Sequence, residues 1–243
     1  MASRSRCTVK TERNVTGAPD RATNWHRRPV DAVVFGASGA VVLVAAMIAA
    51  RGVSNLEATL FHAVNDLPDW LYRPMWLAQY LGLLLLPLGV AVIAAALRRW
   101  RLAVGLVLLV PLKLLVEKGV LKQLLYRARP GTSVCDKDPA CLHLRGDVPL
   151  VGPSFPSGHV IIAFGIAWLV APYVGHRARW ALAATCAAVV LARIYLGAHN
   201  PLDVLAGAAS GIAIAAALNL MLGVPNVGAG GRDGGQPVAD TTR

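Results

Sequence analysis

Hydrophobic positions along the chain fall into six long stretches separated by polar segments. The first stretch holds no charged residue and is close to the roughly 20 apolar residues that a helix needs to cross a bilayer. The pattern therefore predicts an all-α polytopic membrane protein, a bundle of six transmembrane helices in one domain. The six stretches are Ala32–Ala50, Pro74–Leu97, Leu102–Val120, Val160–Val174, Trp180–Gly197 and Val204–Val224.

Three of the stretches are imperfect. The third contains Lys113 and Glu117, the fifth contains Arg193, and the fourth is short unless its helix begins in the preceding Pro/Gly/Ser turn. Ionisable side chains are costly inside a membrane and usually serve a function there. We therefore expect the functional groups to lie in or next to these three stretches.

The composition favours a membrane protein over a soluble enzyme. Hydrophobic residues make up 56% of the 243 residues and charged residues 15%, and the mean hydropathy is +0.53, which is unusual for soluble chains. The 24 Lys and Arg against 13 Asp and Glu give a net charge of +11, which is typical of proteins that bind nucleic acid or anionic membranes. Because the chain is so apolar and only 6% aromatic, we expect the lipid bilayer as its partner and no nucleic acid.

Basic residues in the short loops predict the orientation. The N-terminal tail and the turns at 98–101 and 176–179 are rich in Arg, and they share one side if the spans alternate. Basic short loops usually remain cytoplasmic. We therefore expect a basic cytoplasmic tail over 1–31, a six-span domain over 32–224, and a disordered, Gly-rich cytoplasmic tail over 225–243.

The segment after the first span could form an amphipathic helix. Leu56, Leu60, Phe61 and Val64 share one helical face, and Glu57 lies off it. Such a helix can lie in the membrane interface. An ordinary loop helix that packs on the bundle explains the pattern equally well.

Three clusters on the predicted extracytoplasmic side could do chemistry, and the first follows the third span. If that helix continues outward, Lys122 and Arg129 share a face, and Pro130 ends the helix at Arg129. A lysine and an arginine on one face suit a phosphate, because lysine gives a point charge and arginine a bidentate fork. The alternative is a pair of side chains that reach out to lipid headgroups.

The second cluster, Ser157, Gly158 and His159, precedes the fourth span. Backbone N–H groups and a hydroxyl at a helix N-terminus can bind an anion. A histidine in the first turn can act as a general acid. The alternative is a helix cap with a structural histidine.

The third cluster consists of Arg193, His199 and Asp203. His199 and Asp203 are four residues apart, so the Asp203 carboxylate can accept a hydrogen bond from one imidazole N–H group of His199. The other imidazole nitrogen then remains free as a nucleophile. Arg193 is too costly in a span to lack a role. Its alternative role is to pair with Glu117 or a backbone carbonyl.

Taken together and in this order, the three clusters resemble the signature of the type 2 phosphatidic acid phosphatase family, a superfamily that also includes the vanadium haloperoxidases. The resemblance rests on Lys122 to Arg129-Pro130, on Pro156-Ser157-Gly158-His159, and on the segment 193–203. One departure is visible. The third motif of the family usually begins Ser-Arg, whereas Ala192 precedes Arg193 here, which removes one hydroxyl but no charged or catalytic position.

The resemblance implies a mechanism. His199 would attack phosphorus and form a phosphohistidine, Asp203 would orient it, and His159 would protonate the leaving group. No metal and no cofactor is implied, because cations and a helix terminus neutralise the phosphoryl group. The implied phosphate-binding residues are Lys122, Arg129, Ser157, Gly158 and Arg193.

The implied function is a membrane hydrolase of a bacterial cell envelope that dephosphorylates a lipid phosphate or diphosphate of the phosphatidate, phosphatidylglycerophosphate or polyprenyl type. One alternative is a lipid-linked phosphotransferase with the same covalent half-reaction. Another is a non-catalytic transporter or lipid-binding membrane protein.

Cys135 and Cys141 frame a short loop on the predicted extracytoplasmic side. That side permits disulfides, and we expect a local disulfide bond between the two. Free thiols, or a metal site with Asp136 or His143, are the alternatives.

Overall fold

The computed structural model describes residues 25–135, 141–146, 148–149 and 151–225. Within these ranges the regular elements are helices apart from two short strands, β1 (Trp25–His26) and β2 (Val224–Pro225), which pair antiparallel. The all-α prediction is thus confirmed. Most of the two predicted tails, and Asp136, lie outside the described residues.

The helices follow the hydrophobic pattern closely. The α-helices are α1 (Pro29–Ala49), α2 (Asn55–Asn65), α3 (Tyr72–Gln79), α4 (Leu86–Ala96), α5 (Trp100–Leu114), α6 (Lys122–Leu124), α7 (Pro130–Ser133), α8 (Gly158–Val170), α9 (His176–Tyr195) and α10 (Pro201–Leu222). Four shorter segments join them: the 3-10 turns η1 (Asp69–Leu71), η2 (Tyr80–Gly82) and η4 (Ala171–Tyr173), and the π-helix η3 (Leu115–Leu121).

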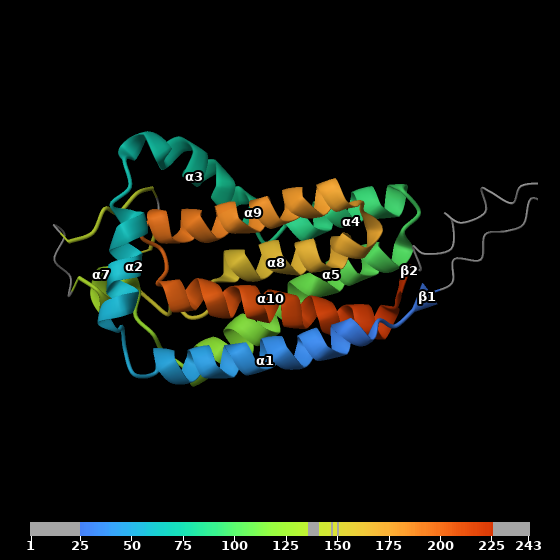
Figure 1. The fold of residues 1–243 in the computed structure, drawn as a ribbon, viewed down its shortest axis with the longest axis horizontal. Helices are drawn as coiled ribbons and strands as arrows, with labels where there is room; N and C mark the ends of the chain where they lie inside the picture. The colour runs from blue at the N-terminus through green and yellow to red at the C-terminus, as the bar shows by residue number, and fades with distance from the viewer. Residues whose placement is uncertain (1–24, 136–140, 147, 150, 226–243) are drawn as a thin grey trace, which may run out of the picture.

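The long helices form an elongated bundle (Figure 1). Helices α1, α10, α8, α5, α4 and α9 run along its long axis, α2 and α7 lie at one end, and the strand pair lies at the other. The pairing of β1 with β2 brings the two ends of the described chain together.

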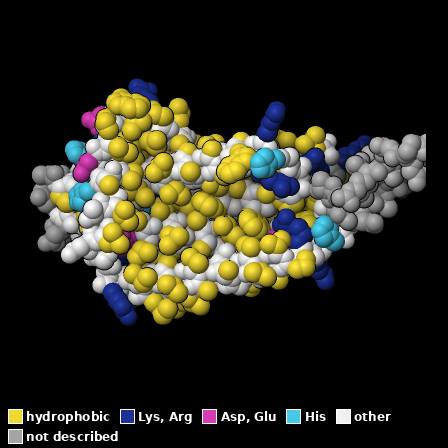
Figure 2. All heavy atoms as spheres, in the orientation of Figure 1, with side chains coloured by type: hydrophobic (Ala, Val, Ile, Leu, Met, Phe, Trp, Pro, Cys, Tyr) yellow, Lys and Arg dark blue, Asp and Glu magenta, His cyan; other side chains and the backbone are white. Residues whose placement is uncertain are grey.

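Within the described part of the chain, three helices, α1, α9 and α10, are long and apolar enough to cross a membrane, and a fourth span results if α3 and α4 count as one broken segment. Hydrophobic side chains cover the middle of the face in Figure 2, and Lys and Arg gather toward its ends. This distribution is that of an integral membrane protein.

The prediction of one continuous helix over Pro74–Leu97 is wrong. The helical segments before and after the break meet at an angle of 63°. Gly82 is the last residue of the helical segment before the break, and it lies against α8. A Cβ atom at this position would lie 2.5 Å from the His159 carbonyl oxygen, so only glycine fits there. Pro87 stands in the first turn of α4, where a residue without an N–H group is well tolerated.

The C-terminal helix α10 forms the centre of the bundle, between α1 and α8. Gly211 lets the backbones of α10 and α8 approach, because a Cβ atom there would lie 2.3 Å from the Ile161 carbonyl oxygen. Small residues favour such close packing of membrane helices. The largest apolar cluster lies where α4, α5, α8 and α10 meet.

Helix α2 packs on the end of the bundle, in a different rotation from the amphipathic face predicted for it. Phe61 is fully buried, but Leu56 and Leu60 are exposed. Glu57, predicted to lie off the packed face, is buried and pairs with Arg127. The ion pair makes burial of this carboxylate favourable, so α2 is a structural part of the bundle end.

Candidate active site

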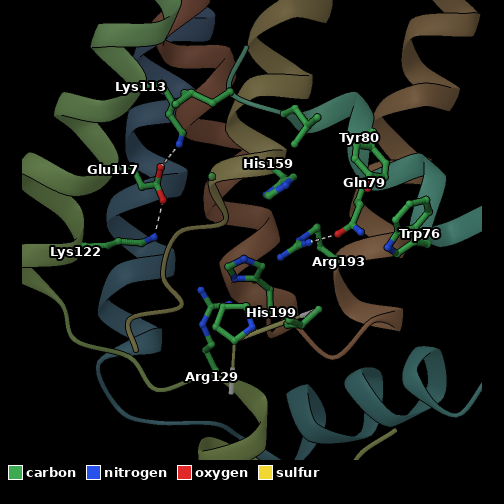
Figure 3. A pocket seen from close by; sticks show the side chains of 16 residues that line it. Trp76, Gln79, Tyr80, Lys113, Glu117, Lys122, Arg129, His159, Arg193 and His199 are labelled. Atoms are coloured by element: carbon green, nitrogen blue, oxygen red, sulfur yellow. Dashed lines mark hydrogen bonds and ion pairs between the residues drawn. The ribbon is translucent and has the colours of Figure 1, made fainter. Parts of the chain in front are cut away.

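A cavity of about 490 Å³ is lined by residues that include Arg129, which directly precedes α7, and Gly158, which begins α8. Six of the eight residues predicted from the three clusters for catalysis and phosphate binding line it: Lys122, Arg129, Gly158, His159, Arg193 and His199. The other two, Ser157 and Asp203, are fully buried next to it. Figure 3 shows the lining side chains from close by.

Lys122 and Arg129 line the same cavity, but not as one helical face. Helix α6 ends at Leu124, Leu125 is extended, and Arg129 is the extended residue before α7. The condition for a shared helical face, a helix that continues outward to Arg129, is therefore not met. Pro130 starts α7 and holds Arg129 in the extended conformation that a following proline favours.

Each of these two cations has a fixed partner. The Arg129 Nη1 atom donates to the Ala198 carbonyl oxygen at 2.8 Å. The Lys122 ammonium lies 2.5 Å from the Glu117 Oε1 atom. The bond to Ala198 ties Arg129 to the turn that carries His199.

The second cluster forms the start of α8. Ser157 is the N-cap residue, and Gly158 is the first residue of the helix. The Ser157 N–H group donates to the Asp203 carbonyl oxygen at 2.9 Å, which joins the first turns of α8 and α10. The helix N-terminus and the His159 ring are thereby fixed against the third cluster.

Arg193 lies in the last turn of α9 and reaches into the cavity. Its Nη1 atom donates to the Gln79 Oε1 atom at 2.6 Å. The alternative pairing with Glu117 is wrong, because Lys113 and Lys122 hold that carboxylate. Gln79 is a site residue that the sequence analysis missed.

His199 and Asp203 are brought together at the start of α10. The His199 Nδ1 atom lies 3.7 Å from the Asp203 Oδ2 atom, slightly beyond hydrogen-bond distance. Asp203 also accepts a bond from the Asn200 N–H group at 2.8 Å in a capping box. Burial lowers the pKa of His199 to about 4, although Asp203 acts in the opposite direction. At neutral pH the imidazole is therefore uncharged and nucleophilic.

Behind this pair lies an ion network that the sequence analysis did not identify. The Arg127 guanidinium donates to the Asp203 Oδ1 atom at 2.9 Å and to both oxygens of Glu57, at 3.0 and 2.5 Å. Burial alone would lower the pKa of Arg127, but the bonds to Glu57 and Asp203 raise it. The network holds Asp203 as a carboxylate behind His199.

Several buried polar atoms at the cavity have no hydrogen-bond partner within the described part of the chain. The donors among them are Arg129 Nε, Arg193 Nε and Ser157 Oγ. Buried polar groups are nearly always bonded. Donors left free around one cavity indicate a site for an anion with several acceptor oxygens.

One group of possible metal ligands was found among the described residues, and it lies outside this cavity. His62 stands near Cys135 and Cys141, but the two sulfur atoms form a disulfide bond with each other. That bond joins the end of α7 to the following segment.

Comparisons with known proteins identify the family of the chain. A family model described as the PAP2 superfamily matches residues 84–224. The chain belongs to the PAP2 superfamily. No curated protein sequence matches the chain significantly.

Two solved structures share the PAP2 fold. Aquifex aeolicus LpxE is 25% identical with a TM-score of 0.60, over 68% of this chain and 95% of that protein. A transmembrane PAP2 type phosphatidylglycerolphosphate phosphatase from Bacillus subtilis is 23% identical with a TM-score of 0.58, over 78% of this chain and 94% of that protein. The second likeness shows the fold alone.

Proposed function

We propose that this protein is a membrane hydrolase that removes phosphate from a lipid phosphate or diphosphate through a phosphohistidine. The observation that carries the proposal is the set of unpartnered donors around the uncharged His199. Membership of the PAP2 superfamily supports it.

The proposed reaction has two steps. The free nitrogen of His199 attacks phosphorus, and the bond from phosphorus to the leaving oxygen breaks while the protonated form of His159 gives that oxygen its proton. Burial and Arg193 lower the pKa of His159 to about 3, so this step needs the negative charge of the bound phosphate to raise that pKa. Water then loses a proton to His159 and attacks the phosphohistidine, which releases inorganic phosphate and restores His199. Asp203 stabilises the imidazolium that exists between the two steps.

The cations of the site stabilise the charge of the transferred group. Lys122, Arg129 and Arg193 enter the cavity from different elements, so they surround a phosphoryl group and do not bind only one side of it. Ser157 and the N-terminus of α8 add neutral donors. Fixed donors that face the transferred group stabilise the transition state strongly.

The proposed substrate class follows from the position of the cavity. Leu83 and Leu84 line it together with the charged residues, and the surrounding bundle is apolar on its outside. A substrate with a phosphate at the headgroup level and an apolar tail fits this boundary. Phosphatidate, phosphatidylglycerophosphate and polyprenyl phosphates or diphosphates are candidates.

A phosphate-release screen tests the function. The protein in lipid nanodiscs is given each of the four candidate lipids, and released inorganic phosphate is measured with and without a soluble hydroxyl acceptor. We expect release from at least one lipid without an acceptor. Release that requires the acceptor would identify a phosphotransferase, and no turnover of any lipid phosphate would contradict the proposal.

We further propose that all six apolar segments lie in the bilayer, with the site on the extracytoplasmic side and both tails, 1–31 and 225–243, in the cytoplasm. The basic residues of the turns at 98–101 and 176–179, opposite the site, support this orientation. The disulfide between Cys135 and Cys141 also supports it, because disulfides persist in oxidising compartments.

Labelling in intact cells checks the orientation. In a chain with Cys7 and Cys186 replaced by serine, Val151→Cys and Arg177→Cys place single thiols at exposed positions on opposite sides. We expect a membrane-impermeant thiol reagent to label the first variant and to spare the second until the cells are opened. The reverse pattern would invert the proposed topology.

A further inference from the structure

The cavity contains an acidic residue where an anion is expected to bind. Among the sixteen described residues that line the cavity, Glu117 is the only acid, and four cations line the cavity with it. A buried carboxylate repels a phosphate group. Its presence in a phosphate site therefore calls for a functional explanation.

The backbone around Glu117 is built to join it to two lysines. Lys113 stands four residues before Glu117, one turn away on an α-helix, and pairs with it. Lys122 stands five residues after it, which on an α-helix would be rotated by about 140°. The π-helix Leu115–Leu121 widens the turn so that positions five apart align, and the Lys122 ammonium meets the carboxylate at 2.5 Å.

The carboxylate also lies against the first turn of α8. A Cβ atom on Gly158 would stand 2.7 and 2.8 Å from the two Glu117 oxygens. Glu117 thus contacts two of the groups assigned to phosphate, the Lys122 ammonium and the N-terminus of α8. Figure 3 shows the carboxylate between the two lysines, facing the cavity.

We propose that Glu117 competes with phosphate for Lys122. In the free protein Glu117 holds the Lys122 ammonium, and the phosphoryl group of the substrate draws that ammonium away. Lys113 keeps the carboxylate in place meanwhile. When the reaction ends, Glu117 recovers Lys122 and weakens the hold on inorganic phosphate, so that product leaves faster. This role rests on the proposed function, since it assigns Lys122 to phosphate.

The test measures binding of inorganic phosphate to the protein in nanodiscs by titration calorimetry. Replacing Glu117 with glutamine keeps the shape and removes the charge. We expect phosphate to bind about tenfold tighter to Glu117→Gln than to the parent protein. In turnover, KM and kcat should both fall, because substrate binds better and product leaves more slowly.

A matched control is Asp31→Asn at the opposite end of the bundle. Asp31 is a fully buried carboxylate that pairs with Arg28 and accepts a bond from Trp168. We expect its replacement to leave phosphate affinity unchanged. An equal gain in both variants would overturn the proposal, because the effect would then come from total charge.

A double-mutant cycle tests whether Glu117 acts through Lys122. In a Lys122→Met background, Glu117→Gln should change phosphate affinity less than twofold. A full tenfold gain in that background, or unchanged or weaker binding in folded Glu117→Gln, would overturn the proposal. If Glu117→Gln fails to insert into the membrane, Glu117→Asp replaces it, because the shorter side chain moves the carboxylate away from Lys122 by one methylene. This variant should bind phosphate about threefold more tightly than the parent protein. Unchanged or weaker binding would also overturn the proposal.

The two proposals can fail separately, because phosphate binding is measured without turnover. A wild-type protein that hydrolyses a lipid phosphate while Glu117→Gln leaves phosphate affinity unchanged refutes only the role of Glu117. A protein that hydrolyses none of the lipids, but binds phosphate tenfold tighter as Glu117→Gln, refutes only the hydrolase.

Discussion

Replacing His199 with alanine should lower phosphate release by at least about 1,000-fold, the scale seen when a covalent nucleophile is removed. The variant has no nitrogen to attack phosphorus, and the remaining cations bind substrate without a path to products. Phosphate release from the preferred lipid in nanodiscs measures the loss. The KM should change little, since Lys122, Arg129 and Arg193 remain.

The matched control for this variant is His143→Ala. The His143 side chain is 60% exposed on the same end of the bundle and does not line the cavity. Its replacement should leave turnover unchanged. A His199→Ala protein that is folded and still turns over would rule out the phosphohistidine mechanism.

The second large effect is expected from Arg127→Met. This change leaves Glu57 and Asp203 buried without their shared cation, and breaking a buried ion pair costs about 3–5 kcal/mol. We expect a clear fall in the thermal unfolding midpoint in detergent. Turnover should fall as well, because Asp203 no longer has a fixed position behind His199.

A second substitution distinguishes this ion network from simple loss of packing. Glu57→Gln in the Arg127→Met background removes one of the two uncompensated charges, so it should recover part of the lost stability. Glu57→Gln alone should destabilise the protein, because Arg127 then loses a partner. If the double variant is less stable than Arg127→Met, the charge argument is wrong.

The sequence predicted the helices well because a membrane imposes a strong pattern. Five of the six apolar stretches coincide with a helix, or with a helix and the turn that continues it. The break of the helix near Gly82 was not predicted, because the stretch around it is uniformly apolar and hydropathy alone does not distinguish a broken helix from a continuous one. Gly82 and Pro87 were the local signals of that break.

The site was predicted where its residues are close in sequence. His199 and Asp203 flank one helix start, so their spacing fixes their geometry whatever the rest of the fold does. Lys122 and Arg129 reach the cavity by a route that helical periodicity did not predict, since α6 ends early. In this case the motif located the residues and the fold determined how they meet.

The missed residues are those whose partners are distant in sequence. Glu57 and Arg127 are separated by 70 positions, and Gln79 and Arg193 by 114. No local pattern connects such pairs. The available hint was chemical: Glu57 is an acid in a short apolar helix, and such an acid needs a cation nearby.

The place of α10 at the centre of the bundle has a consequence for biosynthesis. This helix packs against the first long helix of the chain and carries Asp203 in its first turn. The ribosome must therefore synthesise nearly the whole chain before α1 can pack against α10 and before Asp203 can lie beside His199. Chains that stop short of α10 should enter the membrane as unassembled helices, without activity and exposed to quality-control proteases.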